Sequence, residues 1–199
     1  MNERFERAIA LIDEENSRDP NHELLDDKAV PRELLYSQRL TDWVLRLEPN
    51  ASEALRLAAR SQHIARWKIP RNSYPDGRAG YLKWRNDLKH FHADLTAEIL
   101  RNTRYNDSTI TRVRALNLKQ GLPTDPEAQT IEDALCLVFL QYQFSELAAK
   151  LSPEKVVNAL RKSWNKMSDK ARRAALELPF DEREKSLLQQ ALAVHQGIS

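Results

Sequence analysis

The sequence predicts an all-α protein, a single-domain bundle of eight or nine helices. Apolar residues recur at helical spacing in almost every segment, which is the main signal of amphipathic helices. Asn-Gly pairs and alternating runs of Val, Ile and Thr, which indicate β-hairpins, are absent. Proline and glycine fall where helices are expected to end. We expect one domain over residues 1–199, with its core in 31–150 and covering helices in 152–196.

The first two helices are expected before residue 49. Apolar residues at helical spacing from Phe5 to Ile12 indicate the first, which a turn around Asp19–Pro20–Asn21 ends. Pro31 suits the first position of the second helix, because the N–H that proline lacks would be unpaired there anyway. This helix stops before Pro49, since a residue that precedes proline disfavours helical backbone.

Two long helices follow, on either side of an irregular connection. Asn50 and Glu53 resemble a capping box that opens a helix over Ala51–Trp67. Lys68–Gly80 contains two prolines and two glycines and is long for a loop between helices, and loops of this length are commonly functional. An apolar stripe then indicates a helix over Tyr81–Thr103.

The C-terminal half begins with a shorter helix over Asn106–Lys119. Asp125–Pro126 is a strong start signal for a helix that reaches about Lys150. The centre of that helix, Ala134–Leu140, is apolar on every face and is expected to be a buried spine. The remaining three helices open at Ser152–Pro153, Ser168 and Asp181.

Composition indicates a cytoplasmic protein without a membrane segment. The chain is 41% hydrophobic and 30% charged, as in ordinary soluble proteins, and its longest apolar run is too short to cross a bilayer. The lone Cys136 excludes an internal disulfide and fits a reducing compartment. Thirty-one basic and 29 acidic residues give a net charge of +2, so nucleic-acid binding would need a local basic patch. The sequence does not determine the oligomeric state.

Candidate functional residues concentrate in Leu57–Ala93, which holds three of the five histidines, two of the four tryptophans, five arginines and three lysines. Helical spacing places His92 on the buried stripe of its helix and His90 on the solvent side. His63 lies one turn before Trp67, beside Gln62. Buried imidazoles are either hydrogen-bonded core residues or ligands, and both interpretations stay open for His63 and His92.

Two carboxylates precede the apolar spine. Glu132 and Asp133 need a cation, a metal ion or several donors if either is buried. His63, His92 and Asp133 would form a plausible N,N,O ligand set for a divalent ion such as Mn²⁺, Fe²⁺ or Mg²⁺. The alternative is an ion pair with an arginine, namely Arg60, Arg66 or Arg85.

Cations and aromatic residues border the Lys68–Gly80 connection. Planar guanidinium groups suit phosphate or carboxylate, and aromatic rings can stack on a base, so we expect an anionic, nucleotide-like ligand. The alternative is a solvated surface of ion pairs. The predicted ligand-binding residues are Arg66, Arg71, Tyr74, Arg78, Tyr81 and Arg85. Lys83 is a further candidate for a catalytic cation.

Six sequence blocks resemble the family catalogued as domain of unknown function 4202. The blocks are YSQRL (36–40), ARSQHIARWKIPR (59–71), YP (74–75), GYLKWR (80–85), IEDALCLVFL (131–140) and SWNKMS (163–168). The resemblance covers most of the chain. It implies an all-helical protein and no particular activity.

A second resemblance, in layout, is to HD-domain metal-dependent phosphohydrolases and their di-iron oxygenase relatives. Gln62–His63 takes the place of the His-Asp doublet of that superfamily, His90 or His92 that of a later histidine, and Asp133 that of the final aspartate. Tyr36 stands where those proteins have their first histidine. These differences favour one metal ion, or none, over a two-metal centre.

The leading hypothesis is an HD-like hydrolase that acts on a phosphorylated or nucleotide-like small molecule. A divalent ion on His63, His92 and Asp133 would activate water, with Glu132 as orienting group or general base. Arg71, Arg78 and Arg85 would clamp the anion. One alternative is a non-catalytic module that binds RNA or a nucleotide. Another is a helical interaction scaffold.

Overall fold

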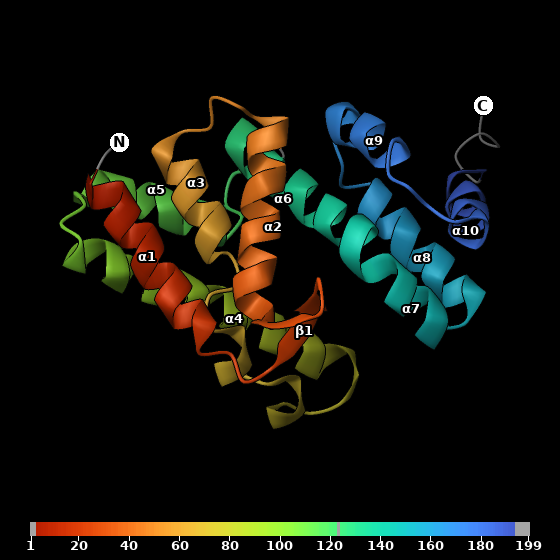
Figure 1. Ribbon diagram of the computed structural model, residues 1–199, viewed down its shortest axis with the longest axis horizontal. Helices are drawn as coiled ribbons and strands as arrows, with labels where there is room; N and C mark the ends of the chain where they lie inside the picture. Colours follow the sequence, from red (N-terminus) through yellow and green to blue (C-terminus); the bar gives the residue numbers. More distant parts are fainter. Residues whose placement is uncertain (1–2, 123, 194–199) are drawn as a thin grey trace. The chain divides into compact units, whose positions relative to one another are not determined.

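A computed structural model describes residues 3–122 and 124–193 (Figure 1). The chain divides into two compact units, Met1–Ile131 and Glu132–Ser199. The described residues form ten α-helices and one small two-stranded sheet, so the all-α prediction is confirmed. Within the same residues, no helix combines the length and the apolar character needed to cross a membrane.

The first unit is built from five helices and the start of a sixth. Its helices are α1 (Glu3–Ser17), α2 (Arg32–Leu47), α3 (Glu53–Ser61), α4 (Gly77–Asn102), α5 (Asp107–Asn117) and the first part of α6 (Pro126–Val138). Helix α3 packs against α1, α2 and α5, and α4 packs against α5 (Figure 1). Fully buried aliphatic side chains fill the space between them: Ile12, Leu40, Leu55, Leu57, Ile64, Leu100 and Leu116.

A β-hairpin between α1 and α2 corrects the prediction that strands are absent. Strand β1 (His22–Leu25) pairs antiparallel with β2 (Lys28–Pro31), and Leu25 lies opposite Lys28. The two connecting residues, Asp26 and Asp27, have φ of 48° and 61°. Two-residue hairpin turns with positive φ at both positions favour Asn-Gly, but aspartate also tolerates this conformation. The Asp-Asp pair therefore takes the place of the sequence signal that was missing.

The predicted helix over Ala51–Trp67 ends early, at Ser61. The chain turns through Ala65, whose φ is 54°, and the Ala65 N–H donates to Oδ1 of the fully buried Asn16 at 3.1 Å. Two short 3₁₀ helices, Arg66–Lys68 and Arg71–Ser73, follow before α4 begins. The turn therefore places residues 62–66 against the buried side of α4. In the predicted helix, these residues would have continued along the axis of α3.

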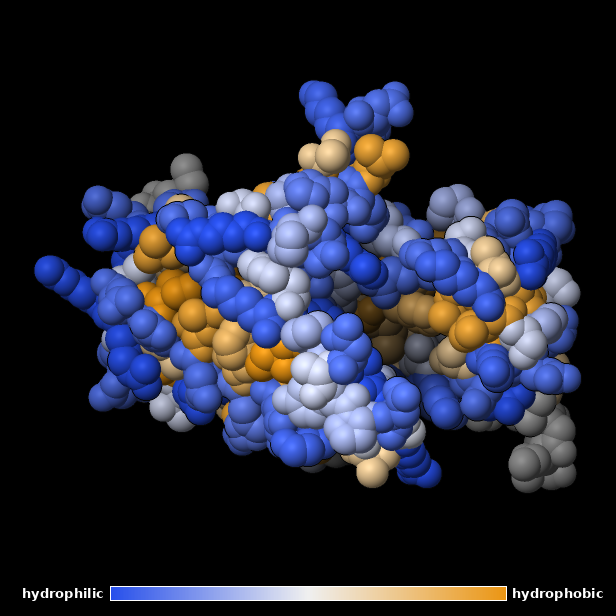
Figure 2. Space-filling view, turned by 90° about the horizontal axis from the view of Figure 1, so that it is seen from below, coloured by the Kyte–Doolittle hydropathy of each residue, from blue (hydrophilic) through white to orange (hydrophobic). Residues whose placement is uncertain are grey.

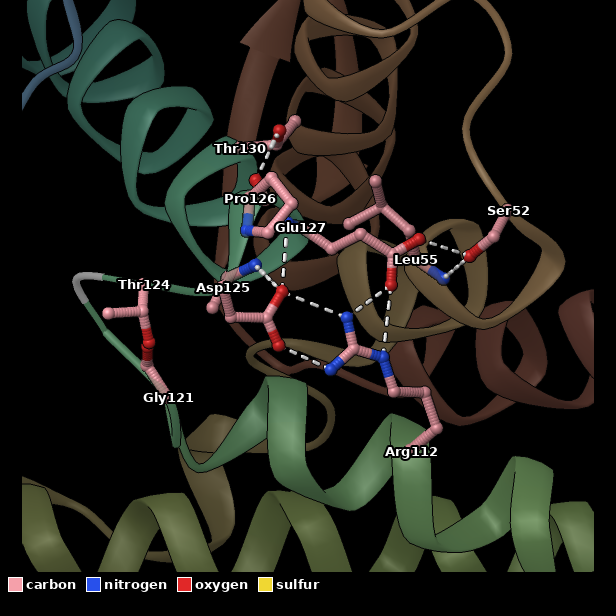
Figure 3. A network of polar contacts seen from close by, with 10 residues as sticks. Ser52, Leu55, Arg112, Gly121, Thr124, Asp125, Pro126, Glu127 and Thr130 are labelled. Carbon is pink, nitrogen blue, oxygen red and sulfur yellow. Dashed lines mark hydrogen bonds and ion pairs between the residues drawn. The ribbon is translucent and has the colours of Figure 1, made fainter.

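An arginine network holds the start of α6 against α5 (Figure 3). The Arg112 guanidinium pairs with the carboxylates of both Asp125 and Glu127, and Ser52 donates to Glu127. Asp125 also accepts from the backbone N–H of Glu127 at 3.0 Å, as a helix cap does. Arg112 lowers the pKa of Asp125 to about 2. The start signal at Asp125–Pro126 is thus confirmed.

The second unit contains the rest of α6 and four further helices, α7 (Phe144–Lys150), α8 (Pro153–Trp164), α9 (Asp169–Leu176) and α10 (Glu182–Ala193). The predicted helix from Asp125 to Lys150 is interrupted by a π-helical segment, Phe139–Gln143. The apolar spine is buried almost throughout, as predicted. Helix α8 packs against α10, and its apolar residues Val156 and Leu160 are buried.

The face drawn in Figure 2 is largely hydrophilic, with smaller hydrophobic areas between charged side chains. Among the described residues, the large apolar side chains that stay exposed are Leu24, Leu25, Tyr81, Leu82, Tyr142, Leu151 and Leu176.

Candidate functional site

His63 and His92 lie side by side in the first unit. Their ring centroids are 5.8 Å apart, although 28 residues separate them in the chain. His63 stands on the turn that follows α3, and His92 lies in α4 with 3% of its surface exposed. The position of His92 on the buried stripe is as predicted. Together the two imidazoles, His92 buried and His63 half-buried, are the centre of a polar cluster.

The hydrogen bond of His92 defines its chemistry. Nδ1 lies 2.7 Å from the carbonyl oxygen of Ile64, and a carbonyl only accepts, so Nδ1 carries the proton. Nε2 is then an acceptor, and it is buried without a hydrogen-bond partner among the described residues. Burial lowers the pKa of His92 to about 4, which keeps the ring neutral at pH 7. His92 therefore presents an unused basic nitrogen.

Three side chains surround the His63 ring. The Tyr36 ring stacks on it at 4.5 Å between centroids, and Arg66 Nη1 lies 3.4 Å from Nε2. On the other side, Glu33 Oε2 lies 3.9 Å from Nδ1. Burial, and then the positive charge of Arg66, lower the pKa of His63 well below its usual value. This imidazole is neutral too, so its contact with Glu33 is no ion pair at pH 7.

Glu33 is the carboxylate of the cluster, and the sequence analysis missed it. It lies in the first turn of α2, where its backbone N–H donates to Asp19 Oδ2 at 3.0 Å. Its Oε2 is buried without a hydrogen-bond partner among the described residues. Burial raises the pKa of Glu33 to about 7, although Arg66 acts in the opposite direction. A carboxyl group with this pKa can both take up and release a proton near neutral pH.

A signal for Glu33 was present in the sequence. Counting in helical steps of three or four from the apolar residues of α2 leads back through Ser37 to Glu33, and all of these positions are buried. The sequence analysis instead selected Glu132 and Asp133, which precede the apolar spine. An acidic residue on the buried stripe of its own helix is the stronger indication, because that stripe faces the core.

Gln62 and Asn117 form the polar surroundings of the two histidines. Gln62 Nε2 donates to the Asn117 carbonyl at 3.3 Å, and Asn117 Nδ2 donates to Ser61 Oγ at 3.1 Å. Both side-chain carbonyl oxygens, Gln62 Oε1 and Asn117 Oδ1, are buried without a donor among the described residues. Buried polar atoms are rarely left unpaired, so several unpaired acceptors in one region favour a ligand that supplies donors.

Positive charge adjoins the cluster. Arg66 lies over the Trp84 ring at 5.0 Å, and Arg85 lies over the Tyr81 ring at 5.8 Å. Arg66, Lys119 and Arg85 all contribute to lowering the pKa of His63. Lys119, which the sequence analysis did not single out, has the positive φ of 57° that asparagine or glycine more commonly adopts. These cations favour an anionic ligand.

Most of the other predicted site residues form hydrogen bonds or ion pairs within the connection before α4 and within α4 itself. Arg71 donates to the carbonyl oxygens of Tyr74 and Pro75 at 3.0 and 2.9 Å. The Tyr74 hydroxyl donates to Asp87 at 2.9 Å, and Lys83 pairs with the same carboxylate at 2.7 Å. Arg78 is exposed near the start of α4. Arg71, Tyr74 and Lys83 thus have partners within the loop and α4.

Glu132 and Asp133 belong to the second unit, where each has a partner. The Asp133 carboxylate accepts from the Ser168 N–H at 2.8 Å and from the Ser168 hydroxyl at 2.6 Å, and Glu132 pairs with Lys166 at 3.1 Å. Across the described part of the chain, no three His, Cys, Asp or Glu side chains are arranged to hold a metal ion. The divalent ion stays a prediction, and metal analysis of the purified protein tests it.

The fold and this cluster define a helical protein with buried, unpaired imidazole and carboxylate groups beside cations. The chain belongs to the family described as Domain of unknown function (DUF4202), whose model matches residues 6–188. The match includes both histidines, Glu33 and the connection before α4. Comparisons with curated proteins and with solved structures gave no match.

Proposed function

We propose that this protein is a hydrolase that acts on a small phosphorylated molecule, with its acid–base chemistry at Glu33, His63 and His92. The observation that carries the proposal is the Glu33–His63 contact beside the unpaired Nε2 of His92. Strongly shifted pKa values cluster at functional sites, and here two neutral imidazoles adjoin a carboxyl group whose pKa is about 7.

Each residue of the cluster has a role in this reaction. Ionised Glu33 accepts a proton from a water molecule, and Nε2 of His92 accepts a hydrogen bond that orients the same water. The water oxygen forms a bond to phosphorus while the ester P–O bond breaks. Glu33 then returns its proton to the leaving oxygen. Arg66, beside His63, stabilises the charge of the phosphoryl oxygens.

Core histidines with a purely structural role would be fully hydrogen-bonded. Here four buried acceptors lack donors among the described residues: Glu33 Oε2, Gln62 Oε1, His92 Nε2 and Asn117 Oδ1. An unpaired buried polar group costs about 1–3 kcal/mol, which a ligand with donors would recover. This cost supports a binding or catalytic role for the cluster.

A screen of phosphate monoesters and nucleotides, with turnover followed by release of inorganic phosphate, tests the proposal. Glu33→Gln is expected to lower kcat by about 10²-fold or more, because general acid–base groups contribute this much. His90→Asn, on the exposed side of α4, is the matched control and is expected to keep full activity. Equal turnover in Glu33→Gln and the unaltered protein contradicts the mechanism. Parallel reactions with EDTA, Mg²⁺, Mn²⁺ or Fe²⁺ test the metal prediction separately.

Non-catalytic nucleotide binding is the second candidate. The pairing of Arg66 with the Trp84 ring and of Arg85 with the Tyr81 ring favours it, since cations and aromatic rings together recognise a phosphate and a base. This role requires nucleotide binding without turnover, and an affinity that Glu33→Gln leaves within about twofold. Arg66→Ala is expected to weaken that binding.

A further inference from the structure

A basic segment crosses α8, the following turn and the start of α9. Residues 155–173 contain seven basic residues and one acidic residue, Asp169, whereas the whole chain is nearly balanced at 31 to 29. Glu154 and Glu177 flank the segment. The basic residues are Lys155, Arg161, Lys162, Lys166, Lys170, Arg172 and Arg173. Positive charge is therefore concentrated in this segment, although the chain as a whole is nearly neutral.

Most of this charge faces solvent. Five of the seven basic side chains are exposed, and only Arg161 and Arg172 are half-buried. On α8, Lys155 and Lys162 are seven residues apart and share one face, since α8 packs against α10 through its opposite, apolar side. Lys166 is exposed in the turn after α8, and Lys170 and Arg173 are exposed on α9.

Two ion pairs join cations of the segment to carboxylates. Lys166 pairs with Glu132 at 3.1 Å, and Arg172 pairs with Asp169 at 3.2 Å. Basic residues outnumber acidic ones within the segment by six, so the segment carries a net positive charge. A surface of this kind attracts polyanions over distances of about 10 Å at moderate salt.

An aromatic ring lies among the cations. Trp164, the last residue of α8, is half-buried, and Arg172 stands 5.9 Å from its ring centroid. Surfaces that bind single-stranded nucleic acids combine a row of cations with rings on which unpaired bases stack. Bases in a duplex are stacked on each other and are not available for this contact.

We propose that the exposed cations of α8, the following turn and α9, together with Trp164, bind the phosphate backbone of a single-stranded nucleic acid. These cations are Lys155, Lys162, Lys166, Lys170 and Arg173. A membrane surface fits less well, because a helix that lies in a membrane needs an exposed apolar face. The apolar face of α8, with Val156 and Leu160, is buried inside the unit. This role is independent of the hydrolase proposed above.

Binding of a fluorescent oligouridine RNA of about 20 nucleotides, followed by anisotropy, tests the proposal. Each phosphate contact to a single strand contributes about 0.7 to the slope of log affinity against log salt, so five cations predict a slope of about 3 to 4. From about 50 to 200 mM salt, the affinity is expected to fall about 100-fold. A protein that does not bind this RNA at the lower salt concentration overturns the proposal.

Charge-reversal variants distinguish binding at this surface from binding that depends only on the net charge of the protein. Lys155→Glu, Lys162→Glu and Arg173→Glu combined are expected to weaken binding at least tenfold and to reduce the slope by about 2. The control combines Arg7→Glu, Lys28→Glu and Arg101→Glu, which reverses three exposed cations of the first unit and changes the net charge equally. Circular dichroism confirms that both variants fold.

Three further outcomes contradict the proposal. One is an equal loss of RNA affinity in the control variant, because binding would then follow net charge alone. Another is duplex RNA of the same length bound as tightly as the single strand, which would leave Trp164 without a role. The third is binding to vesicles that contain phosphatidylserine, at a salt concentration where RNA does not bind.

Discussion

A buried carboxyl group with a pKa near 7 destabilises the folded state at neutral pH. The unfolded chain releases the Glu33 proton near pH 4.5, whereas the folded protein holds it up to about pH 7. The unfolded state therefore binds fewer protons than the folded state between these values, and stability falls as pH rises through this window. A shift from 4.5 to about 7 corresponds to about 3 kcal/mol, lost in full above pH 7.

Glu33→Gln is expected to remove this loss. Glutamine has nearly the same shape as glutamate but no charge. The difference in unfolding free energy between the variant and the unaltered protein is therefore expected to be about 3 kcal/mol larger at pH 8 than at pH 4.5, in favour of the variant. Urea unfolding at several pH values measures the change. A stability difference between the two proteins that stays constant from pH 4.5 to 8 contradicts the raised pKa. Higher stability with lower turnover is the combination expected of a functional residue.

At the residue scale, the sequence predicted that His63 and His92 lie together, and their ring centroids are 5.8 Å apart. The third residue of that predicted set, Asp133, accepts hydrogen bonds from Ser168. Glu33 could have been predicted, because it lies on the buried stripe of α2. The roles of Gln62 and Asn117 depend on where α3 ends, and the turn at Ala65 is held by Asn16 from a distant helix. Sequence periodicity does not report such a long-range hydrogen bond.

At the element scale, caps decide where several helices begin. The Ser168 hydroxyl accepts from the Ala171 N–H at 3.3 Å at the start of α9 and also donates to the buried Asp133 carboxylate. Ser152 occupies the equivalent position before α8, but its side chain makes no capping hydrogen bond. The sequence predicted both starts correctly and could not distinguish these two situations.

This difference predicts unequal costs for the same substitution. Ser168→Ala is expected to lower the unfolding free energy by about 1–2 kcal/mol, because α9 loses its cap and Asp133 loses a donor. Ser152→Ala, the matched control, is expected to change it by less than about 0.5 kcal/mol. Chemical denaturation of both variants measures the costs. Equal losses would show that Ser168 contributes no more to stability than a serine whose side chain makes no capping hydrogen bond.

At the scale of the whole molecule, helical periodicity was sufficient for the fold class. The hairpin was missed because its turn uses two aspartates with positive φ, and the long helix after Asp125 was not expected to be interrupted at Phe139–Gln143. Both features depend on local backbone geometry, not on the spacing of apolar residues. The boundary between the two compact units falls between Ile131 and Glu132, inside α6, where no proline or glycine marks it in the sequence.

The buried cluster also affects how stability depends on pH. Burial lowers the pKa of His92 from 6.5 to about 4, so the unfolded state binds more protons in this range and stability falls as pH falls from 6.5 to 4. Glu33 has the opposite effect from 4.5 to 7. Between pH 4.5 and 6.5 each group contributes a slope of about 1.4 kcal/mol per pH unit, and the two slopes cancel.

Two single variants separate these slopes. Relative to the unaltered protein, Glu33→Gln is expected to gain unfolding free energy as pH rises from 4.5 to 6.5. His92→Asn, which keeps a donor close to the position of Nδ1, is expected to gain it as pH falls over the same range. Urea unfolding at pH 4.5, 5.5 and 6.5 measures both differences, and any pH-independent cost of either substitution only displaces the lines. Plotted against pH, the two stability differences are expected to have opposite slopes, because burial keeps Glu33 protonated and His92 unprotonated. Parallel plots would mean that at least one of the two groups is solvated in the folded protein.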